Sequence, residues 1–161
     1  GNRFGDWWDV ADLDYSHKEL WEYQIETLKY WARLVDGFRC DVAPLVPLEF
    51  WKQAREEVAA VRPGCFWLCE SVERGFHVAA RAQGFASLSD AELYQAFDAG
   101  YDYDVYPYFR DYLEGRISLT QYWPLALKPS GGQPATTRGR RVRVSWKFSG
   151  CDQTSAESSG T

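Results

Sequence analysis

Hydrophobic residues recur at helical spacing in two stretches of the first half of the chain. Residues 16–35 place them at intervals of three and four, at Trp21, Ile25, Leu28, Ala32 and Val35. Ser16 and Glu19 stand at the spacing of a capping box, which predicts that a helix begins there. Residues 47–62 show the same periodicity after an initial proline, at Phe50, Trp51, Ala54, Val58 and Val61. The pattern predicts two helices, each with one apolar face.

A short apolar run follows each of these helices and ends at a carboxylate. Residues 37–41 end in Asp41, and residues 65–70 end in Glu70. A run of about five residues is long enough for a strand. Strands that alternate with helices indicate βα units and a parallel sheet, and the ends of barrel strands reach the active-site face. We therefore expect Asp41 and Glu70 on adjacent strands of a parallel barrel, opening into one cleft.

The second half of the chain is predicted to continue this alternation. Residues 74–87 are polar and predict a loop, after which Ser89 and Glu92 form another capping box for a short helix that extends to Phe97. Residues 101–105 alternate aromatic and acidic side chains, which predicts a third strand with one polar face. The remaining apolar positions predict two further helices, over 108–113 and 118–127.

Composition limits the class of protein. With 161 residues, 45% hydrophobic and 17% aromatic, the chain is predicted to form one domain with a sizeable core. A net charge of -5 gives no indication of a basic surface that would bind nucleic acid. The chain has no run of about 18 apolar residues, so no membrane span is predicted. Cys40, Cys65 and Cys69 lie in the predicted strands, and no Cys or His pair has zinc-like spacing. We interpret these cysteines as core residues and expect no metal.

The last segment of the chain differs from the rest in composition. Residues 1–128 carry 13 Lys and Arg against 21 Asp and Glu, whereas residues 129–161 carry five against two and are rich in Gly, Ser, Thr and Arg. A polar segment without apolar periodicity is predicted to be disordered. An abrupt change of this kind also arises when a reading frame is lost. We therefore divide the chain into a domain of residues 1–128 and a basic tail of residues 129–161.

Two carboxylates facing one cleft are the groups that glycoside hydrolysis uses. Retaining enzymes hold them about 5–5.5 Å apart, which neighbouring strands about 4.8 Å apart can achieve. Arg39 lies two residues before Asp41, so both side chains share one face of the strand, and the guanidinium favours Asp41 as the ionised nucleophile. Glu70 follows an apolar run, and an apolar setting suits a proton donor.

Several segments also resemble one known family. Residues 37–43, with the sequence GFRCDVA, resemble the fourth-strand motif of the alpha-amylase family, glycoside hydrolase family 13. Residues 66–71 are similar to its fifth-strand segment, and residues 9–16 to the stretch that leads from its inserted loop domain back into the barrel. Residues 101–104 stand where the sixth strand would run. The resemblance covers residues 6–127.

The resemblance implies a role for each residue that matches these motifs. Asp41 would form the covalent glycosyl intermediate, Glu70 would act as acid and then as base, and Arg39 would orient Asp41. The implied substrate is an alpha-linked glucan or a smaller alpha-glucoside. Many starch-degrading members have Lys and His where this chain has Pro44 and Leu45, so the usual calcium and leaving-side contacts are not expected. Asp12 matches a calcium ligand of some relatives, but we interpret it as a structural acid.

The resemblance implies a partial (β/α)8 barrel, from the third helix through the sixth strand and its helix. The family's third-strand motif would precede Gly1, and its seventh-strand motif, with a third catalytic Asp, would follow Leu127. A whole barrel takes about 250 residues. We therefore expect the chain to derive from an enzyme but to be unstable and inactive when isolated, since a partial barrel leaves strand edges unpaired.

Two other hypotheses stay open at this point. In the first hypothesis, the chain belongs to a non-catalytic carbohydrate-binding or transport-associated protein that keeps an amylase-like barrel. In the second, the two carboxylates are an accidental pair in an unrelated α/β domain. The sequence does not separate hydrolysis from transglycosylation, and it predicts neither the compartment nor the oligomeric state.

Overall fold

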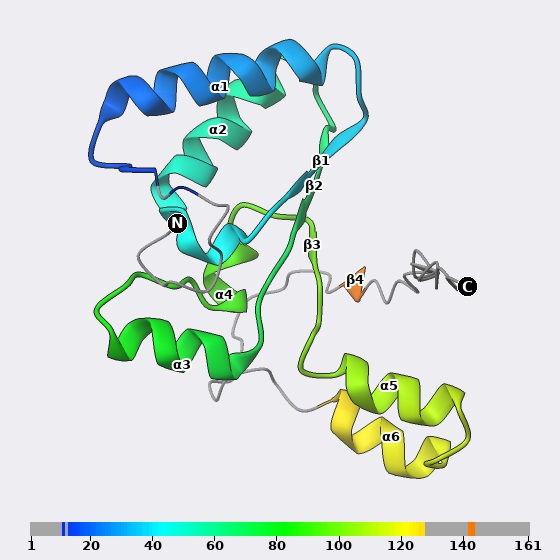
Figure 1. The fold of residues 1–161 in the computed structure, drawn as a ribbon. Helices are drawn as coiled ribbons and strands as arrows, with labels where there is room; N and C mark the ends of the chain where they lie inside the picture. The colour runs from blue at the N-terminus through cyan, green and yellow to red at the C-terminus, as the bar shows by residue number, and fades with distance from the viewer. Residues whose placement is uncertain (1–10, 12, 128–141, 144–161) are drawn as a thin grey trace, which may run out of the picture.

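A parallel sheet organises the chain in the computed structural model, which describes residues 11, 13–127 and 142–143 (Figure 1). Its strands, in the order in which they pair, are β1 (Gly37–Cys40), β2 (Phe66–Cys69), β3 (Ala99–Gly100) and β4 (Val142–Arg143). The helices are α1 (Lys18–Ala32), α2 (Leu48–Val61), α3 (Arg74–Ala82), α4 (Asp90–Leu93), α5 (Tyr106–Leu113) and α6 (Leu119–Ala126), with a 3-10 turn η1 (Ala43–Leu45) after β1. The described residues thus form an α/β fold, as the sequence predicts.

The register of β1 and β2 determines where the two carboxylates emerge. The strands run parallel, and their last residues, Cys40 and Cys69, are paired. Asp41 and Glu70 therefore follow neighbouring strands at the same edge of the sheet. The prediction that they lie on adjacent strands is confirmed.

The core is built from aromatic rings around β2. Trp67 is 1% exposed, and its ring lies at centroid distances of 5.4 Å from Phe38, 6.4 Å from Trp51 and 6.1 Å from Phe97. Phe50 of α2 contacts the Trp21 ring of α1 at 5.6 Å. Helices α1 and α2 thus pack together and cover β1 and β2 through their predicted apolar faces (Figure 1). The aromatic side chains that the core buries among the described residues are Trp21, Phe50, Trp51, Trp67 and Phe97.

A half-buried polar contact joins α2 to the segment that leads into β3. Asp98 accepts a hydrogen bond from the Trp67 backbone N–H at 2.9 Å and pairs with Arg55 of α2 at 2.5 Å. Arg55 also donates to the Ala96 carbonyl oxygen at 2.7 Å. The guanidinium therefore provides hydrogen-bond partners for the Ala96 carbonyl and the Asp98 carboxylate, just before β3, and this holds the sheet against the helix.

The three cysteines of the described residues are buried thiols, as expected for core residues. Cys40, Cys65 and Cys69 are 8%, 7% and 2% exposed and form no disulfide. Burial raises the pKa of Cys40 and of Cys69 to about 12. Thiols with these pKa values stay protonated at neutral pH and act as small apolar groups.

Three predictions of secondary structure are wrong. The Ser16 capping box does not form, because the Asp14 side chain accepts the Ser16 backbone N–H at 3.0 Å and holds Ser16 in a turn before α1. Residues 101–105 are not a strand, since Asp102 accepts the Val105 N–H at 3.1 Å and turns the chain toward α5. The polar stretch predicted as a loop contains α3, whose Ala-rich sequence favours a helix.

The capping box at the start of α4 is confirmed. Ser89 and Glu92 exchange the expected contacts, with the Ser89 backbone N–H donating to Glu92 Oε2 at 2.7 Å. The helix is shorter than predicted and ends at Leu93, and the chain then turns toward β3.

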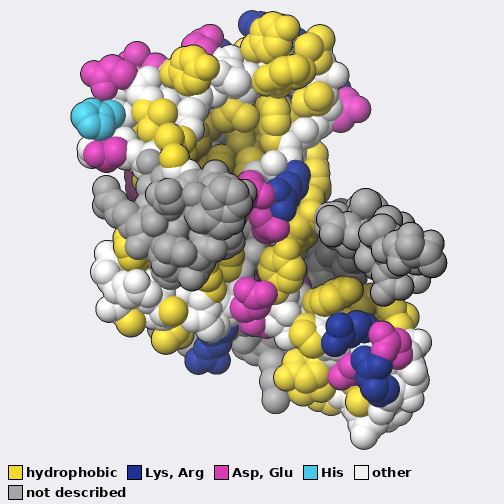
Figure 2. Space-filling model, viewed as in Figure 1, with side chains coloured by type: hydrophobic (Ala, Val, Ile, Leu, Met, Phe, Trp, Pro, Cys, Tyr) yellow, Lys and Arg dark blue, Asp and Glu magenta, His cyan; other side chains and the backbone are white. Residues whose placement is uncertain are grey.

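Helices α5 and α6 form a hairpin that packs mainly on itself. Tyr112 of α5 stacks on Tyr122 of α6 at a centroid distance of 5.5 Å. The hairpin leaves several large apolar side chains exposed, among them Leu113, Leu119 and Trp123, and Figure 2 shows hydrophobic side chains on its surface. Among the described helices, none combines the length and the apolar character that crossing a membrane requires.

Some predictions fall on residues outside the described ranges. These are Asp12, residues 9 and 10 of the segment 9–16 that resembles the loop-domain junction, and the tail over 129–161 except for its two β4 residues. The β4 backbone pairs with β3.

Candidate active site

Arg39 brings the two predicted catalytic carboxylates together. Its Nη1 donates a hydrogen bond to Asp41 Oδ1, and its Nη2 forms an ion pair with Glu70 Oε1 at 2.5 Å. One planar guanidinium therefore spans both acids. The Asp41 side chain is 72% exposed, whereas that of Glu70 is 16% exposed. The structure thus places Arg39, Asp41 and Glu70 in one cluster, with the first acid open to solvent and the second enclosed.

The local backbone explains this arrangement. Cys40 points into the core, so strand alternation places Arg39 and Asp41 on the other face. The Glu70 backbone N–H donates to the Cys40 carbonyl oxygen at 2.9 Å, and the Ala43 N–H donates to the Glu70 carbonyl oxygen at 3.2 Å. The parallel ladder therefore continues past both strand ends and fixes the two acid-bearing residues relative to each other.

The turn after Asp41 is held from two further directions. The Trp51 indole N–H donates to the Ala43 carbonyl oxygen at 3.1 Å, and the Leu88 N–H donates to the Pro44 carbonyl oxygen at 2.8 Å. Val42 adopts a left-handed backbone with φ of +41°, which is costly for a β-branched residue. This conformation directs the Val42 N–H to Glu70 Oε2 at 3.2 Å. The strained residue thus contributes a donor to the second carboxylate.

Glu70 lies in a polar environment, unlike the apolar setting that its preceding run suggested. Both oxygens have partners, since Oε1 accepts the Tyr103 hydroxyl at 3.0 Å and contacts Arg39, and Oε2 accepts the Val42 N–H. The apolar run points elsewhere: Trp67 and Cys69 are buried in the core. Because Glu70 stands beyond the last residue of β2, its side chain meets the loops that follow β1 and β3 rather than the core.

The charges of the cluster follow from these contacts. Burial lowers the pKa of Arg39, but Glu70, the Tyr101 hydroxyl and Asp41 raise it, and the net shift is upward. Burial, the hydrogen bond to Glu70 and its negative charge raise the pKa of Tyr103 to about 12. At neutral pH Arg39 is therefore a cation and Tyr103 a protonated phenol. The Arg39 guanidinium also lies 5.8 Å from the Tyr101 ring centroid.

Tyr103 and the Val42 N–H are parts of this site that the sequence pattern did not predict. The alternation of residues 101–105 predicted a segment with one polar face, but it gave no indication that Tyr103 contacts Glu70. No sequence signal marks Val42, since its left-handed conformation is imposed by the tertiary contacts of the turn.

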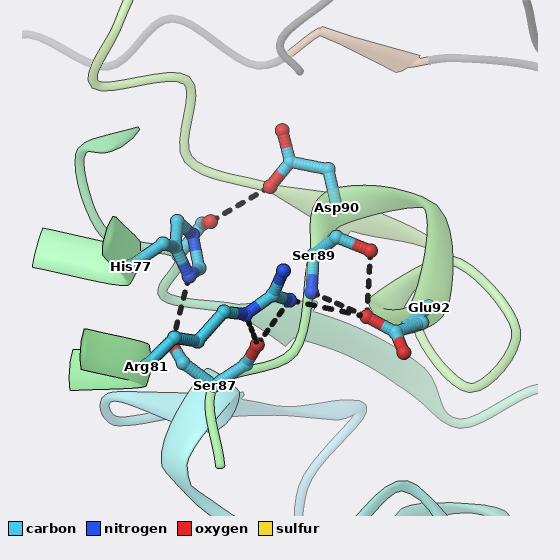
Figure 3. A network of polar contacts seen from close by, with 7 residues as sticks. His77, Arg81, Ser87, Ser89, Asp90 and Glu92 are labelled. Carbon is cyan, nitrogen blue, oxygen red and sulfur yellow. Dashed lines mark hydrogen bonds and ion pairs between the residues drawn. The ribbon is translucent and has the colours of Figure 1, made fainter. Parts of the chain in front are cut away.

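A second polar cluster lies between α3 and α4 (Figure 3). His77 Nδ1 lies 2.7 Å from Ser87 Oγ, Arg81 Nη2 donates to the Ser87 carbonyl oxygen at 2.5 Å, and Ser71 Oγ donates to Asp90 Oδ1 at 2.8 Å. Burial lowers the pKa of His77 and raises that of Asp90. A cavity of about 250 Å³ adjoins the cluster. Because most of these bonds join α3 to the segment that leads into α4, the cluster serves to hold the two helices together.

Within the described ranges no three His, Cys, Asp or Glu side chains are grouped so that they could hold a metal ion. Pro44 and Leu45, the positions at which the resemblance implies no calcium contact, form the η1 turn together with Ala43. Pro44 has no side-chain donor, and the Leu45 side chain is apolar.

Comparison with known proteins connects this geometry to a family. No protein-family model matches the chain. The fold matches the crystal structure of an alpha-amylase from Lactobacillus plantarum with a TM-score of 0.71 and 57% sequence identity, over 78% of this chain and 30% of that chain. A maltogenic alpha-amylase from Bacillus acidopullulyticus is 43% identical over 54 residues, which are 32% of this chain and 9% of that protein. The alpha-amylase MalA from Haloarcula japonica is 35% identical over 51 residues, covering 32% and 8%.

A parallel α/β fold with this likeness defines a glycoside hydrolase segment of TIM-barrel-like architecture. More narrowly, the chain is a fragment of the alpha-amylase family, which confirms the resemblance seen in its motifs. It spans about a third of the solved amylase and about a tenth of these curated relatives.

Proposed function

We propose that the protein to which this segment belongs is a retaining alpha-glycosidase or transglycosylase that acts on alpha-linked glucans or smaller alpha-glucosides. The observation that carries the proposal is the pairing of Asp41 and Glu70 through one guanidinium at the ends of neighbouring parallel strands. The relatives named maltogenic alpha-amylase and alpha-amylase support the substrate class.

The exposure of the two acids supports a distinct role for each. Asp41, open to solvent and bonded to Arg39, attacks the anomeric carbon as a carboxylate and forms the glycosyl ester. Glu70, enclosed between three segments, protonates the leaving oxygen as the glycosidic bond breaks. It then takes a proton from the water or sugar hydroxyl that releases the product. Retention calls for carboxylates about 5–5.5 Å apart, and two acids bonded to one guanidinium are compatible with that spacing.

The order of elements supports a position within the barrel. In this proposal α1 is the third helix, and β1, β2 and β3 are the fourth, fifth and sixth strands, so residues 1–128 form part of the catalytic barrel. The residues that match the fourth-strand and fifth-strand motifs stand at the ends of β1 and β2. Arg39 takes the orienting position before the nucleophile.

Trapping the intermediate tests this proposal. When the whole protein is treated with a fluorinated alpha-glucosyl fluoride, one glycosyl group is expected to accumulate on Asp41, because the fluorine slows release of the ester more than its formation. Peptide mass spectrometry locates the adduct, and proton NMR of the first product is expected to show the alpha anomer. A beta product, or a label on another residue, would contradict the assignment.

The 161-residue chain alone is expected to show no turnover of alpha-glucans. The described residues supply two of the three catalytic carboxylates that the family resemblance implies. The α5–α6 hairpin also exposes apolar side chains that favour association. Reducing-sugar assays and light scattering check this expectation, with the whole protein assayed beside the chain. Turnover by the monomeric chain at a rate comparable to that of the whole protein would show that the expectation is wrong.

A further inference from the structure

We propose that Tyr103 is a positioning residue for Glu70, and that its hydroxyl supports both protonation states that Glu70 passes through during the reaction. This inference rests on the acid/base role proposed for Glu70. Tyr103 lies in the turn after β3, in the segment predicted as a strand. Its hydroxyl donates to Glu70 Oε1 at 3.0 Å.

The Glu70 carboxyl is held by three donors from three segments. Arg39 Nη2 contacts Oε1 at 2.5 Å from β1, the Tyr103 hydroxyl contacts the same oxygen from the turn after β3, and the Val42 N–H contacts Oε2 at 3.2 Å. Without the phenol, Oε1 would depend on Arg39, whose side chain is 41% exposed and also binds Asp41. Tyr103 therefore contributes a hydrogen bond to Oε1 from a donor that is not shared with Asp41.

These three partners differ in what they can do when Glu70 gains a proton. A guanidinium and a backbone N–H only donate, so both favour the carboxylate. A phenol both donates and accepts, so the Tyr103 oxygen can accept a hydrogen bond from a protonated Glu70 after rotation of its O–H. An acid/base residue alternates between these two states within one cycle. Of the three partners, Tyr103 is the one that can form a hydrogen bond with both the ionised and the protonated Glu70.

The turn that carries Tyr103 is rigid enough to serve as a support. The Tyr101 N–H donates to the Cys69 carbonyl oxygen at 3.2 Å, which ties the turn to the last residue before Glu70. The Tyr103 ring packs edge to face on Tyr101 at a centroid distance of 5.8 Å. On the far side, Asp102 accepts the Val105 N–H and closes the turn. Because the support is anchored to β2 itself, it keeps its position relative to Glu70.

The test is Tyr103→Phe in the whole protein, assayed on two alpha-glucosides that differ in leaving group. An alkyl leaving group needs protonation as it departs, whereas an activated aryl leaving group departs without it. Tyr103→Phe is expected to lower kcat for the alkyl glucoside about tenfold, the effect of one hydrogen bond, and to leave glycosylation by the aryl glucoside near wild type. Tyr108→Phe, a change of the same type on the exposed face of α5, is expected to leave both rates unchanged.

Glu70→Gln is measured beside these variants to keep the two proposals separate. If Glu70→Gln shows the leaving-group dependence and Tyr103→Phe equals wild type, the role of Tyr103 is refuted and the proposed function stands. If Tyr103→Phe slows both glucosides equally and lowers the melting temperature, its role is structural and the inference is overturned. If Glu70→Gln itself equals wild type on both, the proposed function fails and the role of Tyr103 fails with it.

Discussion

Glu70→Gln in the whole protein is expected to lower kcat on alpha-glucans by about 100- to 10,000-fold, the usual contribution of a positioned general acid. Glutamine keeps the shape of the side chain and the contact with the Val42 N–H, but its amide is far too weak an acid to transfer a proton to the leaving oxygen. The fold is expected to survive, because the side chain lies at a strand end rather than in the core. Initial rates and a circular dichroism melt measure the two effects separately.

Glu73→Gln is the matched control, since Glu73 is an exposed acid three residues further along the same loop and makes no side-chain cap for α3. It is expected to keep wild-type rates. Asp41→Asn, tested in parallel, is expected to be inactive because an amide does not form the glycosyl ester. Wild-type activity in both Asp41→Asn and Glu70→Gln would refute the catalytic assignment and favour the hypothesis of a non-catalytic carbohydrate-binding protein.

Gly37→Ala is expected to destabilise the protein by about 3 kcal/mol, toward the upper end of the cost of overpacking. A Cβ at Gly37 would lie 2.5 Å from the Phe66 carbonyl oxygen, which belongs to the backbone of the paired strand and cannot rotate away. Relief of the clash requires β1 and β2 to move apart at Gly37, two residues before Arg39 in the same strand. Urea unfolding of the whole protein measures the free-energy change.

Gly75→Ala provides the opposite expectation from the same substitution. A Cβ at this position in α3 meets no atom within 4 Å, and alanine favours a helix over glycine by up to about 1 kcal/mol. The variant is therefore expected to be neutral or slightly stabilised. Equal stability of the two variants would show that β1 and β2 do not approach as closely at Gly37 as the structure indicates.

The sequence was sufficient to predict α1, α2 and the parallel pair β1–β2, because their periodicity and turn residues agree with their packing. The meeting of Arg39, Asp41 and Glu70 was also predictable, since it depends on strand alternation and on the common direction of parallel strands. Each of these rules can be applied to a few consecutive residues of the sequence, without knowledge of the tertiary contacts.

The contacts that define the environment of Glu70 were not predictable in this way. Its apolar neighbours in sequence point into the core, whereas its partners in space come from residues 28 and 33 positions away. The third strand was mispredicted for a related reason, because an Asp102 side chain that closes a turn competes with the pairing that an alternating pattern suggests. Both errors arise where tertiary or side-chain contacts override local pattern.

In the proposed function, the turn after Asp41 affects the free energy with which a sugar binds. The N–H groups of Val42 and Ala43 and the carbonyl groups of Ala43 and Pro44 all have protein partners, contributed by Glu70, Trp51 and Leu88. Folding has therefore already restricted the motion of this stretch of backbone. A ligand that contacts it loses little further conformational entropy on binding, so that more of the contact energy remains available for distorting the sugar toward the transition state.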